Sequence, residues 1–198
     1  MSNEKHLQDL KEIRSMMEHS TRFLSLSGLS GILAGIYSLI GAYYAWQHYI
    51  IDSWPTGTSD YLFFGFVALM VMLFSLLTGF FLTARAAKKN NQSIFTKTAL
   101  RMMVHIGFPL LIGAVFTGAM LYQGKPDFIA AGMLIFYGLG LINGGKYTHN
   151  DIRMLGILNV IIGLFALFFV QYSLQFWALG FGVMHIIYGV AMWYKYEK

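Results

Sequence analysis

The longest uncharged stretch of the chain lies between Arg153 and Lys195, where no aspartate, glutamate, lysine or arginine occurs. Four shorter uncharged stretches precede it, each bounded by charged residues. One crossing of a bilayer takes roughly 20 apolar residues, so each shorter stretch is long enough for one span and the longest for two. Only 12% of the 198 residues are charged, whereas a soluble domain carries about 25%. These features predict an integral membrane protein.

We expect an all-α fold, a polytopic membrane helix bundle with six transmembrane helices. The expected spans cover residues 23–49, 61–84, 102–122, 128–145, 154–171 and 174–194. A tight hairpin at Tyr172 and Ser173 separates the last two, because one helix of their combined length would far exceed the bilayer. The chain then divides into an N-terminal segment, 1–22, and a transmembrane domain, 23–198.

The N-terminal segment is polar but carries an apolar stripe at helical spacing, formed by Leu7, Leu10, Ile13 and Met17. This pattern predicts a short amphipathic helix on the cytoplasmic side. Such a helix can lie on the membrane surface. It can equally pack on the inner loops of the bundle, and docking of a cytoplasmic protein partner is a third interpretation.

The basic residues predict the orientation. If the N-terminus is cytoplasmic, all 14 lysines and arginines except Lys125 fall on the cytoplasmic side, as the positive-inside rule requires. An even number of spans returns the C-terminus to the same side, so both termini are expected in the cytoplasm. The net charge of +5 then reflects orientation and attraction to anionic lipid headgroups. No nucleic-acid partner is expected.

Small residues recur at helical spacing in five of the expected spans, and such stripes are where membrane helices pack closely. The first span has Ser27, Gly31, Gly35, Ser38 and Ala42; the second has Gly65, Ala68, Ser75 and Gly79; the fourth has Gly132, Gly140 and Asn143; the fifth has Gly156, Asn159, Gly163 and Ala166; the sixth has Ala178, Gly182, His185 and Gly189. Because His185 shares the glycine face, we expect it to point into the bundle.

Four polar residues within the spans are candidate ligand-binding residues: His105, Asn143, Asn159 and His185. At about 1.5 Å rise per residue, all four fall in the cytoplasmic half of the spans. Their convergence would form a polar pocket open to the cytoplasm. Ionisable residues inside membranes are functional candidates, but a buried histidine that only hydrogen-bonds and packs is the simpler interpretation of His185.

Other chemistry is disfavoured. The chain has no cysteine, which excludes disulfides and thiolate sites. No carboxylate lies within a span, which argues against a carrier coupled to protons or sodium through such a group. Phosphate-binding glycine loops and zinc motifs are absent from the sequence. We therefore expect no enzyme activity, no metal and no cofactor, although a bis-histidine haem remains conceivable because haem iron accepts imidazole ligands.

The segments "KYTHNDIRMLGILNVIIGL" and "FWALGFGVMHIIYGVAMWYKYEK" resemble a group of uncharacterised bacterial six-span inner-membrane proteins. The resemblance implies the bacterial inner membrane and six spans, and it implies no activity. Three functional hypotheses follow. The first is binding or transport of a small neutral or anionic molecule, the second a sensory or regulatory subunit that docks a cytoplasmic partner, and the third a haem- or quinone-binding redox subunit. Homo-oligomers are compatible with each.

Overall fold

The computed structural model describes residues 26–52, 58–89, 93 and 95–198, and within these ranges the chain is helical and has no β-strand. The expected amphipathic helix at 1–22 lies outside the described residues. The long helices are α2 (Gly28–Asp52), α3 (Thr58–Lys89), α4 (Lys97–Tyr122), α5 (Ile129–Gly144) and α6 (Asn150–Phe168). The last stretch consists of η3 (Val170–Tyr172), α7 (Ser173–Trp177), the π-helix η4 (Ala178–Val183) and α8 (Met184–Tyr196). Two short 3-10 turns, η1 (Pro126–Phe128) and η2 (Gly145–Tyr147), flank α5.

Six helical stretches of the described residues are long and apolar enough to cross a membrane, which fits a multi-pass membrane protein. They are Gly28–His48, Asp60–Lys89, Lys97–Tyr122, Pro126–Tyr147, Asn150–Phe168 and Val170–Tyr196. The expected number of long apolar helical stretches and their order along the chain are confirmed. The main difference is that α3 and α4 extend further into the loop that joins them, because the alanines and lysines at 84–89 continue the helix.

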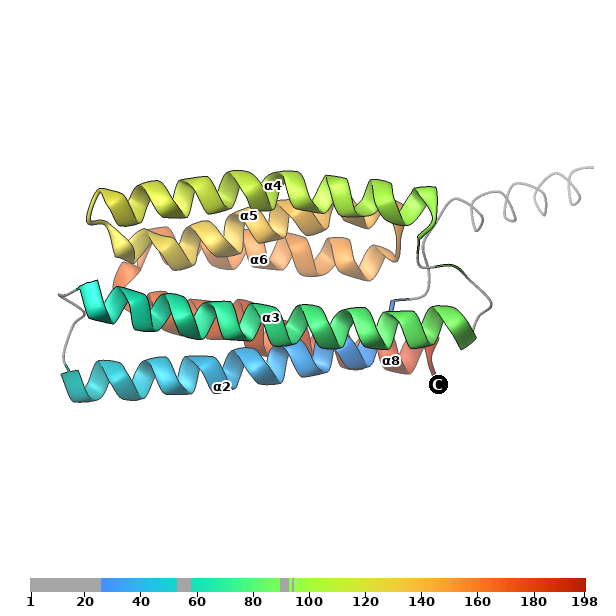
Figure 1. Ribbon diagram of the computed structural model, residues 1–198, viewed down its shortest axis with the longest axis horizontal. Coiled ribbons are helices and arrows are strands. Elements are labelled where there is room, and N and C mark those ends of the chain that lie inside the picture. Colours follow the sequence, from blue (N-terminus) through green and yellow to red (C-terminus); the bar gives the residue numbers. More distant parts are fainter. Residues whose placement is uncertain (1–25, 53–57, 90–92, 94) are drawn as a thin grey trace, which may run out of the picture.

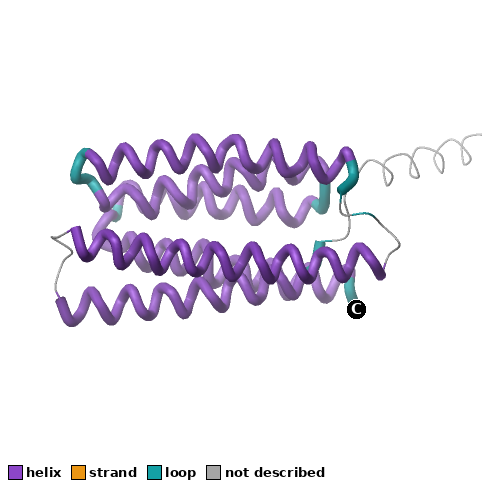
Figure 2. The backbone as a smooth tube through the Cα atoms, viewed as in Figure 1, coloured by secondary structure: helices purple, strands orange, loops and turns teal. Residues whose placement is uncertain are grey.

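The six long stretches lie side by side in two groups of three (Figure 1). One group consists of α4, α5 and α6, and the other of α2, α3 and α8. Turns and loops lie at the two ends of the molecule (Figure 2). We call the end that holds Gly28 and Glu197 the terminal end, and the end that holds the 122–128 and 169–172 turns the distal end. Within the second group α2 packs on α8 and on its π-helix, and the principal contacts between the groups join α6 to α8 and η4, and α5 to α7.

Charge is distributed unequally between these two ends. The described basic residues at the terminal end are Arg85, Lys88, Lys89, Lys97, Arg101, Lys146, Arg153, Lys195 and Lys198. Lys125 is the basic residue of the distal end among those that the structure describes. At the terminal end the Glu197 carboxylate accepts the Gly28 N–H, so the C-terminus of α8 caps the start of α2.

Glycines set the closest helix contacts, as expected from their spacing. A Cβ added to Gly35 of α2 would lie 2.6 Å from the carbonyl oxygen of Gly182, and one on Gly156 of α6 would lie 2.7 Å from that of Gly138 in α5. Backbones this close leave no room for a side chain. For the second span the prediction of close packing is wrong at the glycines. Gly65 and Gly79 of α3 have open space where a side chain would be, so neither contacts another helix closely.

The last expected span is not a regular α-helix. The chain turns at Phe169–Tyr172, close to the expected hairpin, and continues through α7 into the π-helix η4. In a π-helix each N–H bonds five residues back, so one turn contains an extra residue. The N–H of Met184 accordingly bonds the carbonyl oxygen of Leu179. Such single-turn insertions occur frequently at functional sites.

Candidate functional site

Two of the four candidate residues, Asn159 and His185, meet at Gly180 in the π-helix. Both are buried, with exposed fractions of 0% for Asn159 and 6% for His185. Their neighbour Gly180 has no space for a side chain, because a Cβ there would lie 2.7 Å from Asn159 Oδ1 and would also overlap the Leu134 side chain. The expectation that His185 points into the helix packing is confirmed.

Both ring nitrogens of His185 are engaged. Nδ1 lies 2.9 Å from the carbonyl oxygen of Gly180, and Nε2 lies 2.7 Å from the hydroxyl of Tyr137 on α5. A carbonyl oxygen only accepts, so Nδ1 carries the proton and donates it. In the neutral ring Nε2 is then an acceptor, and the Tyr137 hydroxyl donates to it. These two bonds fix one tautomer and leave neither nitrogen open to a metal or haem iron.

Asn159 is only partly satisfied. Its Nδ2 donates to the carbonyl oxygen of Leu155 one turn earlier, at 3.0 Å. Its Oδ1 is fully buried and has no hydrogen-bond partner among the described residues. Unpaired buried acceptors are uncommon and destabilising, and this oxygen lies against the backbone of Gly180, where a glycine leaves room for it.

The other two candidates do not join this cluster. His105 is exposed on α4, where its Nε2 lies 2.9 Å from the Tyr147 hydroxyl and its ring stacks on the Tyr147 ring. Asn143 is half-buried in the last turn of α5. His105 and His185 therefore form two separate histidine–tyrosine pairs, one exposed and one buried.

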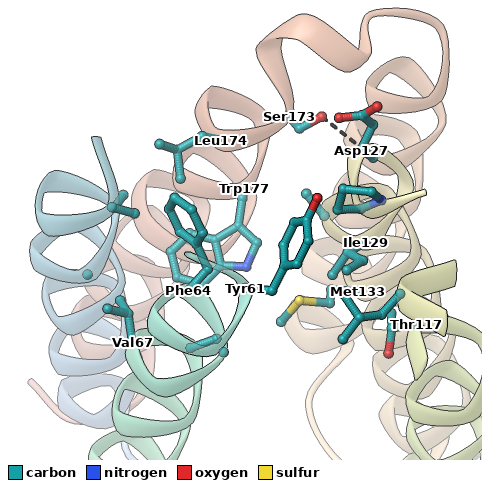
Figure 3. A pocket seen from close by; sticks show the side chains of 18 of the residues that line it. Tyr61, Phe64, Val67, Thr117, Asp127, Ile129, Met133, Ser173, Leu174 and Trp177 are labelled. Carbon is teal, nitrogen blue, oxygen red and sulfur yellow. Dashed lines mark hydrogen bonds between the residues drawn. The ribbon is translucent and has the colours of Figure 1, made fainter. Parts of the chain in front are cut away.

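A large cavity lies elsewhere in the described part of the chain, at the distal end between the two helix groups. Its volume is about 720 Å³. Its walls come from α2, α3, α4, η1, α5 and the segment 170–177. The wall residues include Ala42, Trp46, Tyr61, Phe64, Gly65, Val67, Ala114, Thr117, Asp127, Ile129, Met133, Ser173, Leu174 and Trp177. Figure 3 shows Phe64 and Val67 on one side of this space, and Thr117, Ile129 and Met133 on the other.

The lining is mostly apolar and aromatic. Asp127 is its one charged residue, and the lining includes no lysine, arginine or histidine among the described residues. The Ser173 hydroxyl donates to the backbone carbonyl oxygen of Asp127 at 3.1 Å and so joins α7 to η1 across the distal end of the cavity (Figure 3).

An aromatic chain joins the cavity wall to the buried histidine. The ring of Trp177, which lines the cavity, lies 5.3 Å from that of Phe181. Phe181 in turn lies 5.1 Å from the Tyr137 ring and 6.0 Å from the His185 ring, stacked on the latter. Aromatic pairs at these distances attract each other, so the His185 cluster supports the wall that carries Trp177.

Sequence reasoning missed this cavity and its residues. The aromatic cluster near the distal end of the first span was available as a signal, but aromatic residues at a membrane interface are expected without any site. Trp46 belongs to that cluster and lines the cavity. Tyr137 was missed because its partner His185 lies 48 residues further along the chain.

Within the described ranges, no group of three histidine, aspartate or glutamate side chains could hold a metal ion. Comparisons with protein-family models, with curated proteins and with solved structures each find no match for this chain.

Proposed function

We propose that the chain is a six-span protein of the bacterial inner membrane that binds a small amphipathic molecule in the distal cavity. The proposal includes both termini in the cytoplasm, so that the cavity lies in the outer half of the membrane. The gathering of basic residues at the terminal end supports this orientation. The six helical stretches that are long and apolar enough to cross a bilayer support the membrane.

The cavity is the observation that carries the proposal. Ligand sites in proteins are clefts of about 300–1,000 Å³, mostly apolar with a few polar groups, and this one has about 720 Å³. Packed interiors contain few voids larger than a water molecule. A space of this size between helices is therefore a candidate ligand site, and in a membrane its ligand comes from the lipid phase.

Access from the lipid follows from the position of α3. This helix packs principally on α2, and across the cavity its residues Tyr61, Phe64 and Val67 face Thr117 of α4 and Ile129 and Met133 of α5. The exposed faces of α3 and α4 carry large apolar side chains, among them Phe66, Leu73, Phe108 and Val115. An apolar molecule dissolved in the bilayer can reach the cavity between these two helices without crossing water.

The buried polar cluster takes a supporting part in this proposal. Both nitrogens of His185 are used in hydrogen bonds within the protein, and the aromatic chain through Phe181 leads from that cluster to Trp177. Asn159 and His185 then hold the cavity wall, while the ligand contacts residues nearer the distal end.

Two glycines of α3 provide a matched test. Gly65 lines the cavity and Gly79 does not, and a Cβ added to either glycine would have no neighbouring atom within 4 Å. Gly65→Phe should fill the cavity, whereas Gly79→Phe should place the same ring outside it. Binding is measured by quenching of tryptophan fluorescence with a brominated alkyl amphiphile, since Trp46 and Trp177 line the cavity. Saturable quenching that is lost in Gly65→Phe and kept in Gly79→Phe supports the proposal. If saturable quenching persists equally in Gly65→Phe and Gly79→Phe, the proposal is overturned.

A further inference from the structure

We infer that the ligand of the distal cavity is a cationic amphiphile, whose positive group lies among aromatic rings beside Asp127. This inference rests on the proposed binding function and names the chemical class of its ligand. It differs from the neutral or anionic ligand expected from the sequence, and it follows from which side chains line the cavity.

The first argument is charge. Asp127 is half-buried at the distal end of the cavity and is its one charged lining residue. Lys125, the nearest basic residue along the chain, is exposed and does not line the cavity. An anionic ligand would meet no counter-charge and would be repelled by the carboxylate. A cation gains an attraction that is stronger at a half-buried site than in bulk water.

The second argument is the aromatic lining. Five rings line the same cavity, those of Trp46, Tyr61, Phe64, Tyr172 and Trp177. The faces of aromatic rings attract cations, tryptophan most strongly, and such rings recognise quaternary ammonium groups in other proteins. In Figure 3 the Tyr61 ring lies between the two walls, and its hydroxyl points toward the end that holds Asp127 and Ser173.

The third argument is the gradient from polar to apolar along the cavity. Asp127, Ser173 and Tyr61 lie at the distal end, close to the ends of their helices. Val67, Ala114 and Met133 lie deeper, at positions further from the distal ends of α3, α4 and α5. From Tyr61 to Val67 the helix descends about 9 Å at 1.5 Å per residue. A cationic head at the rim and an apolar body below it match this arrangement.

The test compares two probes with the same brominated alkyl chain, one ending in a trimethylammonium group and the other in its uncharged tert-butyl isostere. The full chain is studied in an uncharged detergent, and saturable quenching of tryptophan fluorescence reports binding. We expect the ammonium compound to bind about tenfold more tightly, as an ion attraction and ring contacts together allow. Asp127→Asn should remove most of this preference and leave the affinity for the isostere unchanged.

Two controls separate the site from general charge effects. Asp60→Asn removes a negative charge at the distal end of α3. Asp60 pairs with His48 and does not line the cavity, so this variant should keep the preference for the ammonium probe. Tyr61→Phe, which keeps the ring, should also keep the preference, whereas Tyr61→Leu should reduce it. If Asp127→Asn retained the full preference for the ammonium probe, the inference that the Asp127 carboxylate attracts the cation would be overturned.

The outcomes distinguish this inference from the proposed function. If both probes bind saturably with equal affinity, the cavity binds amphiphiles and the inference of a cation fails. If neither probe binds saturably, or if Gly65→Phe leaves the binding unchanged, the proposed function fails as well. Preference for the ammonium probe that depends on Asp127 and on the Tyr61 ring supports both.

Discussion

Tyr137 of α5 and His185 of α8 are joined by a 2.7 Å hydrogen bond, with the tyrosine hydroxyl as donor. His105 and Tyr147 form the same kind of pair at 2.9 Å on the exposed side of α4. The two pairs differ in burial and share their chemistry. Comparing the two pairs therefore measures how much burial changes the contribution of such a hydrogen bond to the free energy of unfolding.

Tyr137→Phe should destabilise the protein, because it leaves Nε2 of His185 without a donor in a buried position. An unsatisfied buried group costs about 1–3 kcal/mol in the free energy of unfolding. Tyr147→Phe should cost less, since water or lipid headgroups can replace the lost hydroxyl at an exposed ring. Reversible unfolding in mixed detergent micelles measures both variants. Equal losses would show that the burial of His185 contributes nothing.

Gly180→Ala should be strongly destabilising, because its methyl group would overlap Asn159 Oδ1 and the Leu134 side chain. Overpacking of this kind costs about 1–3 kcal/mol. Gly107→Ala is the matched control: Gly107 lies within α4 with open space around it, and alanine stabilises a helix interior by up to about 1 kcal/mol relative to glycine. Thermal unfolding in detergent compares the two, and a Gly180→Ala variant as stable as Gly107→Ala would contradict the close contact.

Phe181→Leu should weaken ligand binding without emptying the cavity. The Phe181 ring lies between Trp177 of the cavity wall and His185, and an aromatic pair contributes about 0.5–1.5 kcal/mol beyond its buried area. If that contribution positions Trp177, affinity for the brominated probe falls about two- to tenfold. Phe165→Leu, on the exposed face of α6, should leave the affinity unchanged. An unaltered affinity in Phe181→Leu would show that Trp177 is positioned by other contacts.

The proposed orientation predicts which residues react from which side of the membrane. The sequence contains no cysteine, so a single introduced cysteine has no background. Lys125→Cys should be labelled by an impermeant thiol reagent in right-side-out spheroplasts, whereas Lys198→Cys should be labelled only after the membrane is permeabilised. The reverse pattern would invert the orientation and would place the distal cavity in the inner half of the membrane.

The helical spans could be predicted from the sequence because the limits of a span are local: a charged residue ends an apolar stretch wherever the helices later pack. The buried position of His185 could be predicted for the same reason, since Gly182 and Gly189 share its face. Its partner Tyr137 could not, because a hydrogen bond between α5 and α8 depends on which helices are neighbours.

The distal cavity could not be predicted from the sequence for a related reason. A cavity is space left between helices, and it depends on α3 standing apart from α4. The open surroundings of Gly65 and Gly79 illustrate this. With Ala68 and Ser75 they form a stripe at helical spacing like the packed stripes of α2 and α6, so spacing alone predicts contact where the structure has room.

The π-helix at Ala178–Val183 gives the final helical stretch two independently oriented halves. Each residue of an α-helix turns the chain by about 100° about the helix axis. The one extra residue in this turn therefore sets how far the side chains of α7 are rotated about that axis relative to those of α8. Gly182, His185 and Gly189 can then face their neighbours while Leu174 and Trp177 face the cavity. Deleting one residue from this turn would rotate Trp177 away from the cavity by about a quarter of a revolution and leave the contact between α2 and α8 in place.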